Sequence, residues 1–435
     1  MFTFYPLGGI MLLKAKEVHM YLCIDLKTFY ASVECVERGL DPFSVNLVVA
    51  DVSRGKGTVC LAVSPRMKML GVKNRCRVYE IPRGIKYIAA MPRMKKYIEY
   101  SANIYGIYLK YFAKEDIYVY SIDEAFIDVS KYLKLYNLTV EELAKKVIRE
   151  IYMTYKITAT AGIGTNMYLA KIALDITAKH SVTNIGFLDE EKYKKTLWHH
   201  TPLTDFWQIG KGIERRLNKL NLKDMYDIAH ADEKRLYKEF GINARLLIDH
   251  AKGIEPCTIQ DIKNYTRKSI SKSSSQVLFK DYPYDKARLV VKEMVELLSL
   301  ELVEENLVTD TVGVYIGYSK DIVKATGGRI RIDTLTNVYS ELVKAVLTLY
   351  DKTTHLDKYI RRIGISFENV REMGNVQLSL FVNKSREDKE RQVEHVAKDI
   401  KKKMGVSSVI RGMNLEKDAT TLSRNKLIGG HNSGE

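Results

Sequence analysis

The sequence has few of the features that mark a secreted, membrane or metal-scaffolded protein. Its five cysteines form no C-x-x-C pair, which argues against a disulfide framework or a structural zinc site. No apolar run is long enough to span a bilayer, and the first residues lack the early basic region of a secretory signal. With 8 prolines and 26 glycines in 435 residues, a fibrous or disordered chain is excluded. We therefore expect a soluble protein of the reducing cytoplasm, without a membrane-spanning segment.

Several catalytic signatures are also missing. The chain has no G-x-x-x-x-G-K-[ST] segment, which excludes a P-loop ATPase. Gly162 and Gly164 lack the third glycine of a dinucleotide-binding turn, and the nine histidines include no H-E-x-x-H zinc motif. The chemistry must therefore rest on other residues.

Positive charge is in excess. The 69 Lys and Arg exceed the 53 Asp and Glu, for a formal charge of +16. Residues 51–100 alone carry 12 Lys and Arg against 3 Asp and Glu, and glycines and prolines punctuate that window. This distribution predicts a polyanionic partner, either nucleic acid or a membrane surface. The alternative is an ordinary enzyme with a basic surface.

Hydrophobic periodicity predicts an α+β fold in several domains. Strand and helix patterns alternate through the first 180 residues and helical patterns dominate residues 190–253, whereas residues 268–276 (KSISKSSSQ) predict a polar joint. A second α+β unit follows, and the residues from 370 onward predict a charged tail. The first part is expected to contain strands over 21–25, 46–52, 58–63 and 157–163, a hairpin over 117–130, and helices over 29–38, 91–111, 141–155 and 166–178. The second unit is expected to contain helices over 284–305 and 336–350 and strands over 310–317 and 360–367.

Acidic residues occur where they are costly to bury. Asp25 ends an apolar strand, and the carbonyl of Leu26 offers a further oxygen ligand. Asp123 and Glu124 stand together inside the apolar stretch YVYSIDEAFIDV, where burial requires a compensating cation. Carboxylates at neighbouring strand ends could hold the divalent ions of a phosphoryl or nucleotidyl transfer. Spacing alone leaves open that Asp123 and Glu124 are the polar tip of a hairpin.

Several motifs together resemble the Y-family, or translesion, DNA polymerases, and the UmuC-like bacterial branch in particular. The chain shows their order and spacing over roughly residues 20–430, so a chance match is excluded. The motifs are CIDLKTFYASVECVERGLDP (23–42), the segment around SPRMKMLGVK (62–73), YSIDEAFIDVS (120–130), TAGIGTNMYLAKIALDITAKH (160–180), WQIGKGIERRLNKLNL (207–222) and QLSLF (377–381).

The resemblance implies a right-hand polymerase fold and a low-fidelity, template-directed DNA polymerase that copies past damaged bases without proofreading. The implied domains are an N-terminal extension (1–18), palm (19–28 and 98–185), fingers (29–97), helical thumb with a helix–hairpin–helix (186–265), little finger (270–370) and C-terminal tail with a clamp-binding motif (371–435). In this scheme Asp25, Asp123 and Glu124 are catalytic and bind two Mg²⁺ ions together with the Leu26 carbonyl.

The same resemblance assigns the nucleotide-binding residues. Phe29 and Tyr30 occupy the place of an aromatic steric gate, at which Tyr30 would exclude ribonucleotides. Lys68 and Lys171 would contact the triphosphate. Many relatives have a tyrosine three residues before the basic residue at Lys68, but this chain has Pro65, so the phosphate contacts are expected to differ.

DNA and protein contacts are assigned in the same way. Gly210, Lys211 and Gly212 would approach a DNA phosphate closely, and Lys272, Arg329 and Arg331 would follow the backbone. The motif formed by Gln377, Leu378, Leu380 and Phe381 resembles the peptide with which bacterial polymerases bind the sliding clamp. The expected partners are primer–template DNA, dNTPs and the clamp, with no membrane partner. Relatives can also depend on a recombinase filament or accessory subunits.

Two other functions are compatible with parts of the sequence. A nucleotide cyclase could use the same palm chemistry, but the chain lacks GGDEF and has no use there for fingers, thumb or QLSLF. A DNA-binding scaffold docked on the clamp needs no catalysis, and the complete set of three acids argues against it.

Overall fold

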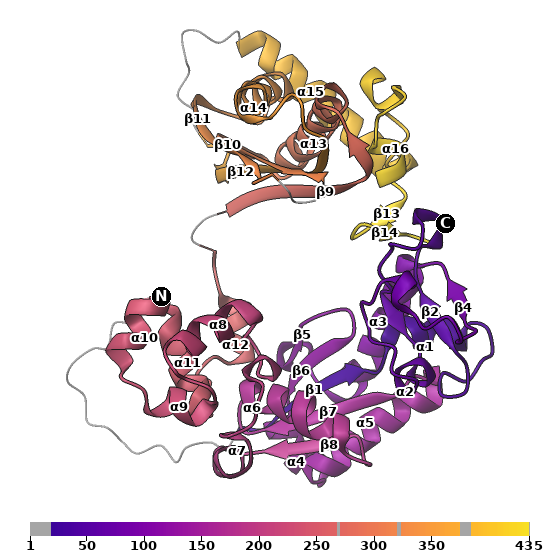
Figure 1. Cartoon of the computed structure of the whole chain (residues 1–435), viewed down its shortest axis with the longest axis vertical. Coiled ribbons are helices and arrows are strands. Elements are labelled where there is room, and N and C mark those ends of the chain that lie inside the picture. The colour runs from indigo at the N-terminus through magenta and orange to yellow at the C-terminus, as the bar shows by residue number, and fades with distance from the viewer. Residues whose placement is uncertain (1–18, 268–269, 320–322, 375–383, 435) are drawn as a thin grey trace. The chain divides into compact units, whose positions relative to one another are not determined.

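The computed structural model describes residues 19–267, 270–319, 323–374 and 384–434. These residues form two compact units. The first comprises residues up to 265 except 53–55 and 92–94, and the second comprises those two short stretches and the residues from 266 onward. Both units combine helices with sheets, so the predicted α+β class is confirmed (Figure 1). Within the described residues no helix is both long and apolar enough to cross a membrane.

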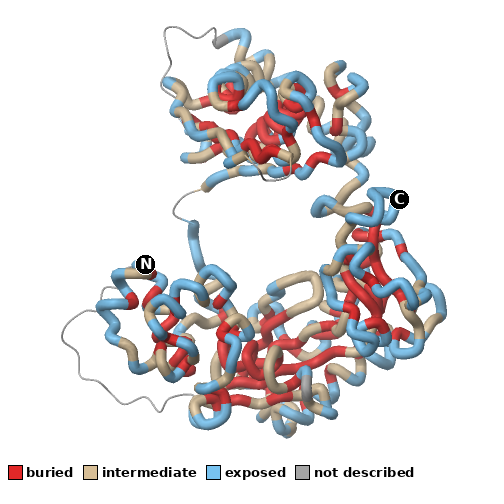
Figure 2. The backbone as a smooth tube through the Cα atoms, in the orientation of Figure 1, coloured by how far each residue is buried: buried red, intermediate tan, exposed pale blue. Residues whose placement is uncertain are grey.

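A five-stranded sheet forms the centre of the first unit (Figure 1). Its strands, in spatial order, are β5 (Ile117–Val119), β6 (Glu124–Asp128), β1 (Tyr21–Leu26), β7 (Ala159–Gly164) and β8 (Ile185–Leu188). All neighbours are antiparallel except β7 and β8, which are parallel. The middle strands β1 and β7 are almost wholly buried (Figure 2), which explains their continuous apolar sequence.

Two helices next to β7 illustrate how local sequence sets this layer. Helix α5 (Val140–Tyr155) begins with a capping box between Thr139 and Glu142 and buries Leu143, Val147 and Ile151. Helix α6 (Met167–Ile172) packs on β7 and β1, and is capped by the Asn166 side chain. The chain then widens into a π-helical turn over Ala173–Thr177, a distortion that occurs frequently at functional sites.

The predicted basic insert forms a small sheet with its own core. Its strands lie in the order β3 (Ala62–Val63), β2 (Leu47–Val49) and β4 (Ile88–Ala90), next to α1 (Phe29–Val36) and α2 (Pro65–Met69). The predicted strands are shorter than expected, because turns occupy their ends. The long helix α3 (Met94–Tyr111) leads back to the large sheet.

Helices make up most of the remainder of the first unit, as predicted. They are α4 (Ser130–Tyr136), α7 (Glu190–Leu197), α8 (Lys211–Lys219), α9 (Met225–His230), α10 (Glu233–Phe240), α11 (Asn243–Ala251) and α12 (Ile259–Asn264).

The second unit is a four-stranded antiparallel sheet with two helices, α13 (Tyr284–Glu304) and α14 (Tyr339–Thr353), packed on one face (Figure 1). Its strands, in spatial order, are β11 (Thr326–Thr336), β10 (Leu307–Tyr318), β12 (Ile360–Glu372) and β9 (Ile270–Tyr282). The sequence analysis did not predict β11.

The prediction of a polar joint over residues 268–276 is wrong, because the described residues 270–276 begin strand β9. This edge strand pairs with β12 and buries Gln276 and Leu278, while Ser273 and Ser275 stay exposed. A strand with one open face needs apolar residues on its other side alone. The serines on the open face therefore made this segment resemble a loop in the sequence.

The prediction of a charged tail is also wrong. Residues 384–434 form α15 (Lys384–Met404), a 3₁₀ turn (Gly412–Leu415), α16 (Thr421–Arg424) and a two-stranded hairpin of β13 (Leu427–Ile428) and β14 (His431–Asn432). The buried Glu293 of α13 accepts hydrogen bonds from Thr420 N, Thr420 Oγ1 and Thr421 N at 2.8, 2.9 and 3.0 Å. Because polar side chains attach this segment to α13, it carries little of the apolar pattern that reveals a core.

Candidate active site

Two of the three predicted acids, Asp25 and Glu124, lie on the paired strands β1 and β6, and Asp123 directly precedes β6. Asp25 is directly opposite Glu124 in the β1–β6 register, and the Leu26 N–H donates to the Asp123 carbonyl at 2.9 Å. The hydroxyl of Ser121 donates to Asp123 Oδ1 at 2.7 Å, which orients that carboxylate. Strand pairing therefore brings together residues that are about a hundred positions apart.

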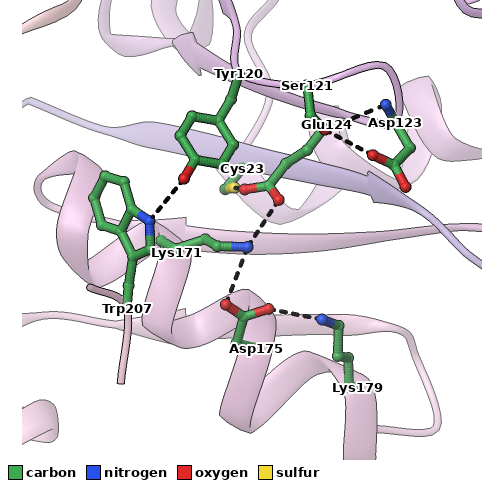
Figure 3. Close-up of polar contacts among 9 residues, drawn as sticks. All are labelled: Cys23, Tyr120, Ser121, Asp123, Glu124, Lys171, Asp175, Lys179 and Trp207. Atoms are coloured by element: carbon green, nitrogen blue, oxygen red, sulfur yellow. Dashed lines mark hydrogen bonds and ion pairs between the residues drawn. The ribbon is translucent and has the colours of Figure 1, made fainter. Parts of the chain in front are cut away.

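The Glu124 carboxylate is already engaged on both oxygens (Figure 3). Lys171 Nζ lies 2.8 Å from Oε2, and the Cys23 thiol lies 3.2 Å from Oε1. Lys171 also pairs with Asp175 at 3.0 Å, and Asp175 pairs with Lys179 at 2.7 Å. Burial lowers the pKa of Lys171, but Cys23, Glu124 and Asp175 outweigh burial and hold that pKa above its usual range. The ammonium predicted to contact the triphosphate is thus paired with two carboxylates here.

The Asp25 carboxyl group is strongly affected by its surroundings. Burial raises its pKa to about 7, and the negative charges of Asp123 and Glu124 add to burial against the opposing effect of Lys179. Among the described residues, no three or more His, Cys, Asp or Glu side chains are gathered closely enough to hold a metal ion. The donor types nonetheless fit a hard divalent cation, because all three acids offer carboxylate oxygens and the crowding around Asp25 favours added positive charge.

Several lysines lie near Asp25, Asp123 and Glu124, the three residues of the acidic cluster. Partial burial lowers the pKa of Lys68; nearby Asp25 raises it, and Lys179 and Lys27 lower it further. Burial and Lys179 likewise lower the pKa of Lys27, against the effect of Asp25. Lys27 and Lys179 were not predicted as site residues, although each lies inside one of the quoted motifs. Their places in the sequence could have indicated the role, because Lys27 follows Asp25 by two residues and Lys179 follows Asp175 by four.

The predicted gate residues differ in their surroundings. Phe29 is 2% exposed and belongs to the core, whereas Tyr30 is partly exposed. The Tyr30 ring stacks on Tyr97 at 4.5 Å between centroids, and the buried Tyr97 hydroxyl donates to Glu34 at 2.8 Å. Burial raises the pKa of Tyr30, and the negative charge of Asp123 adds to that shift while Arg75 opposes it.

The predicted helix–hairpin–helix residues lie at the beginning of α8. Gly210 is the N-cap and makes no side-chain capping bond, so the first N–H groups of α8 have no capping side chain. A Cβ placed on Gly210 or Gly212 would meet no atom within 4 Å. Exposed Lys211 adds positive charge at this open surface.

Three predicted DNA contacts in the second unit lie on two different faces of its sheet. Arg329 and Arg331 lie two positions apart on the same, open face of β11. Arg329 pairs with Glu368 at 3.0 Å, and Arg331 pairs with Asp310 at 3.3 Å. A groove on that face is lined by Ser273, Gly313, Arg329 and Ser366, among others. Lys272 pairs in register with the buried Phe367 and forms an ion pair with Glu305, so it belongs to the helix-covered side. The predicted clamp-binding residues 377–381 lie outside the described residues.

Comparison with known proteins agrees with this architecture. Models of the impB/mucB/samB family and of its C-terminal domain match residues 24–175 and 267–380. The putative UV-damage repair protein UvrX of Bacillus subtilis (strain 168) is 32% identical, over 95% of this chain and 97% of its own length. DNA polymerase IV 2 of the same organism is 29% identical, over 96% of this chain and 99% of its own.

Solved structures support the fold. A Y-family DNA polymerase chimera aligns with a TM-score of 0.63 at 23% identity and covers 81% of this chain and 99% of its own. An insertion ternary complex of a related polymerase aligns with a TM-score of 0.51 over the same shares. The expected Y-family polymerase fold is confirmed.

Proposed function

This chain belongs to the impB/mucB/samB family, and from that premise we propose that it is a DNA-directed DNA polymerase that extends primers past damaged template bases. The observation that carries the proposal is the register of β1 and β6, which places Asp25 and Glu124 opposite one another with Asp123 alongside. These acids come from two separate motifs, and nucleotidyl transfer requires carboxylates that converge in this way.

Asp25, Asp123 and Glu124, with the Leu26 carbonyl, are the residues that would hold two Mg²⁺ ions. When bound, such ions neutralise the charge that develops on the triphosphate and the departing pyrophosphate. Ser121 keeps Asp123 oriented by its 2.7 Å hydrogen bond. Lys171 pairs with Glu124 in this structure, and it would be free to contact phosphate if a cation took its place beside that carboxylate.

Positive groups near Asp25 are suited to the triphosphate. Lys179 lowers the pKa of Lys68 and of Lys27, and Lys27 lowers that of Lys68, so an anion among the three lysines would relieve this repulsion. Lysines contact phosphate as point charges, which does not require the tyrosine that Pro65 replaces. Tyr30 stacks on Tyr97 and would close the sugar side of this site against a 2′-hydroxyl.

Contacts with DNA in this proposal are to the backbone. The open N-terminus of α8 receives a phosphate near Gly210 and Gly212, and Arg329 and Arg331 face a second stretch of backbone. Such contacts carry no base information, which fits copying of distorted templates at low fidelity. Residues 377–381 would bind the sliding clamp, and we place the protein in the cytoplasm with the DNA.

Primer extension on undamaged and abasic templates tests the proposal. With Mg²⁺ and dNTPs, the wild-type protein should cross the abasic site. Asp123→Asn should abolish extension but retain DNA binding. Asp128→Asn is the matched control at the far end of β6, because Asp128 accepts a 3.0 Å hydrogen bond from Ser130 N, outside the acidic cluster. Tight DNA binding without extension, even with clamp and recombinase filament added, would instead identify a scaffold.

A further inference from the structure

Trp207 packs against two separate hydrophobic cores of the first unit. Its ring packs with the helical core that includes Leu203 and Leu217, and also with the sheet core that includes Cys23 and Phe126. It lies parallel to the buried His250 ring at 6.2 Å, and His250 in turn stacks on Tyr168 at 3.9 Å. The indole thus lies between the helices and the sheet and contacts side chains of both.

The indole also contacts the turn that carries the acids (Figure 3). Trp207 Nε1–H donates to the Tyr120 hydroxyl at 3.1 Å, and the two rings meet edge to face at 5.8 Å. The N–H groups of Tyr120 and Ser121 both donate to the Glu124 carbonyl at 3.0 Å. Ser121 then donates to Asp123. One continuous set of contacts thus runs from the indole to the Asp123 carboxylate.

On its other side, Trp207 leads directly into the predicted phosphate-binding turn. Gln208 has φ of +71°, which a non-glycine residue adopts only when its surroundings require it. Ile209 is buried, and its N–H donates to the Phe206 carbonyl at 3.0 Å. Gly210 follows as the N-cap of α8. Three residues, two of them constrained, therefore separate the indole from the N-terminus of α8.

We propose that Tyr120 and Trp207 are positioning residues that couple DNA-backbone binding at residues 210–212 to the orientation of Asp123. A phosphate held at α8 fixes Trp207, and the indole hydrogen bond then holds the Tyr120–Glu124 turn in the arrangement that receives divalent cations. The inference rests on the proposed polymerase function and identifies residues outside its acidic cluster. Since linkage is reciprocal, DNA must tighten cation binding by the same factor by which the cation tightens DNA binding.

The Tyr120 hydroxyl offers a precise point of intervention. Tyr120→Phe removes the acceptor of the indole N–H and keeps the ring contacts with Trp207 and Phe126. Loss of one neutral hydrogen bond should weaken the coupling about two- to tenfold. Tyr118→Phe is the matched control, because it removes a hydroxyl from another tyrosine that stacks on Phe126.

The coupling is measured with Ca²⁺ as a divalent probe, at constant ionic strength. The affinity of full-length protein for a primer–template duplex is determined with EDTA and with saturating Ca²⁺, and the ratio of the two affinities reports the coupling. Asp123→Asn should bring this ratio close to one, which locates the effect at the acidic cluster. Tyr120→Phe should keep the EDTA affinity but lower the ratio about two- to tenfold, and should raise the Mg²⁺ concentration for half-maximal extension.

Each outcome decides a different point. The coupling would be overturned if the ratio of the Ca²⁺ and EDTA affinities were the same for Tyr120→Phe as for Tyr118→Phe. It would also be overturned if Tyr120→Phe lost the same affinity in EDTA and in Ca²⁺, because Tyr120 would then be an ordinary DNA-binding residue. Failure of the wild-type protein to extend any primer, together with a ratio of one, would overturn the proposed polymerase function itself. Normal wild-type extension with an unchanged Tyr120→Phe ratio would overturn the inference alone.

Discussion

Gly162 is the position where a single methyl group should disturb the acidic cluster most directly. It lies in β7 opposite Cys23, under the helix that carries Lys171. A Cβ built on Gly162 would lie 2.0 Å from the Ala170 carbonyl oxygen and 2.3 Å from Leu174 N. Both atoms belong to the backbone, so no side-chain rotation can relieve the contact.

The size of the effect follows from these distances. Real Cβ contacts are essentially never below 3.0 Å, so α6 must move by about 1 Å or more in Gly162→Ala. A shift of that size would stretch the 2.8 Å Lys171–Glu124 contact beyond hydrogen-bond range. Overpacking costs about 1–3 kcal/mol, and disruption of a buried ion pair costs about 3–5 kcal/mol. We expect a total of about 4–8 kcal/mol and a melting temperature lower by roughly 10–30 °C.

Thermal unfolding and primer extension together test this expectation. Gly106→Ala is the control, because Gly106 lies within α3 and a Cβ there would meet no atom within 4 Å. That change should leave extension intact and stabilise the protein by about 0.5–1 kcal/mol. If Gly162→Ala unfolded at the wild-type temperature and extended primers normally, the close helix–strand packing would not be what positions Lys171.

Three further outcomes are expected. Tyr30→Ala should raise ribonucleotide incorporation on the order of 10–100-fold, measured as the ratio of kcat/KM for rNTP and dNTP, whereas Tyr30→Phe should keep discrimination; an unchanged ratio in the alanine variant would refute the gate. Burial raises the pKa of Glu394 from 4.5 to about 7, with Glu390 and Glu296 adding to burial and Arg411 opposing it, so the folded protein binds this proton more tightly than the unfolded chain. The stability that this proton contributes is complete below pH 4.5 and is lost as the pH rises to 7, a loss of about 3 kcal/mol at most. Glu394→Gln should remove this loss, as measured by urea unfolding at pH 5 and at pH 8. If the wild-type protein and the variant lost stability in parallel between these pH values, the assignment would be contradicted. Deletion of residues 377–381 should spare distributive synthesis and remove stimulation by the clamp; stimulation that persisted would place clamp binding elsewhere.

Local patterns were sufficient to predict most of the first unit. The apolar run that ends at Asp25, the hairpin around Asp123 and Glu124, and the four-residue spacing of α5 each depend on neighbours within a few positions. Their order along the chain led to the polymerase family, and the family models and the 32% identical relative confirmed it. The first part of the β-strand at residues 270–282 was not predicted, because its pairing with β12, rather than its own sequence, makes it a strand.

The sequence by itself determined which chemical groups the protein carries and in what order its helices and strands follow. Tertiary structure alone decided which of those groups meet. It paired Glu124 with Lys171, brought Tyr120 to Trp207 across 87 positions, and attached residues 411–421 to α13 through buried carboxylates. Periodicity reports which face of an element is apolar, but a polar contact between distant elements leaves no periodic trace. Such contacts arise when strand register and helix packing place their partners within hydrogen-bond distance.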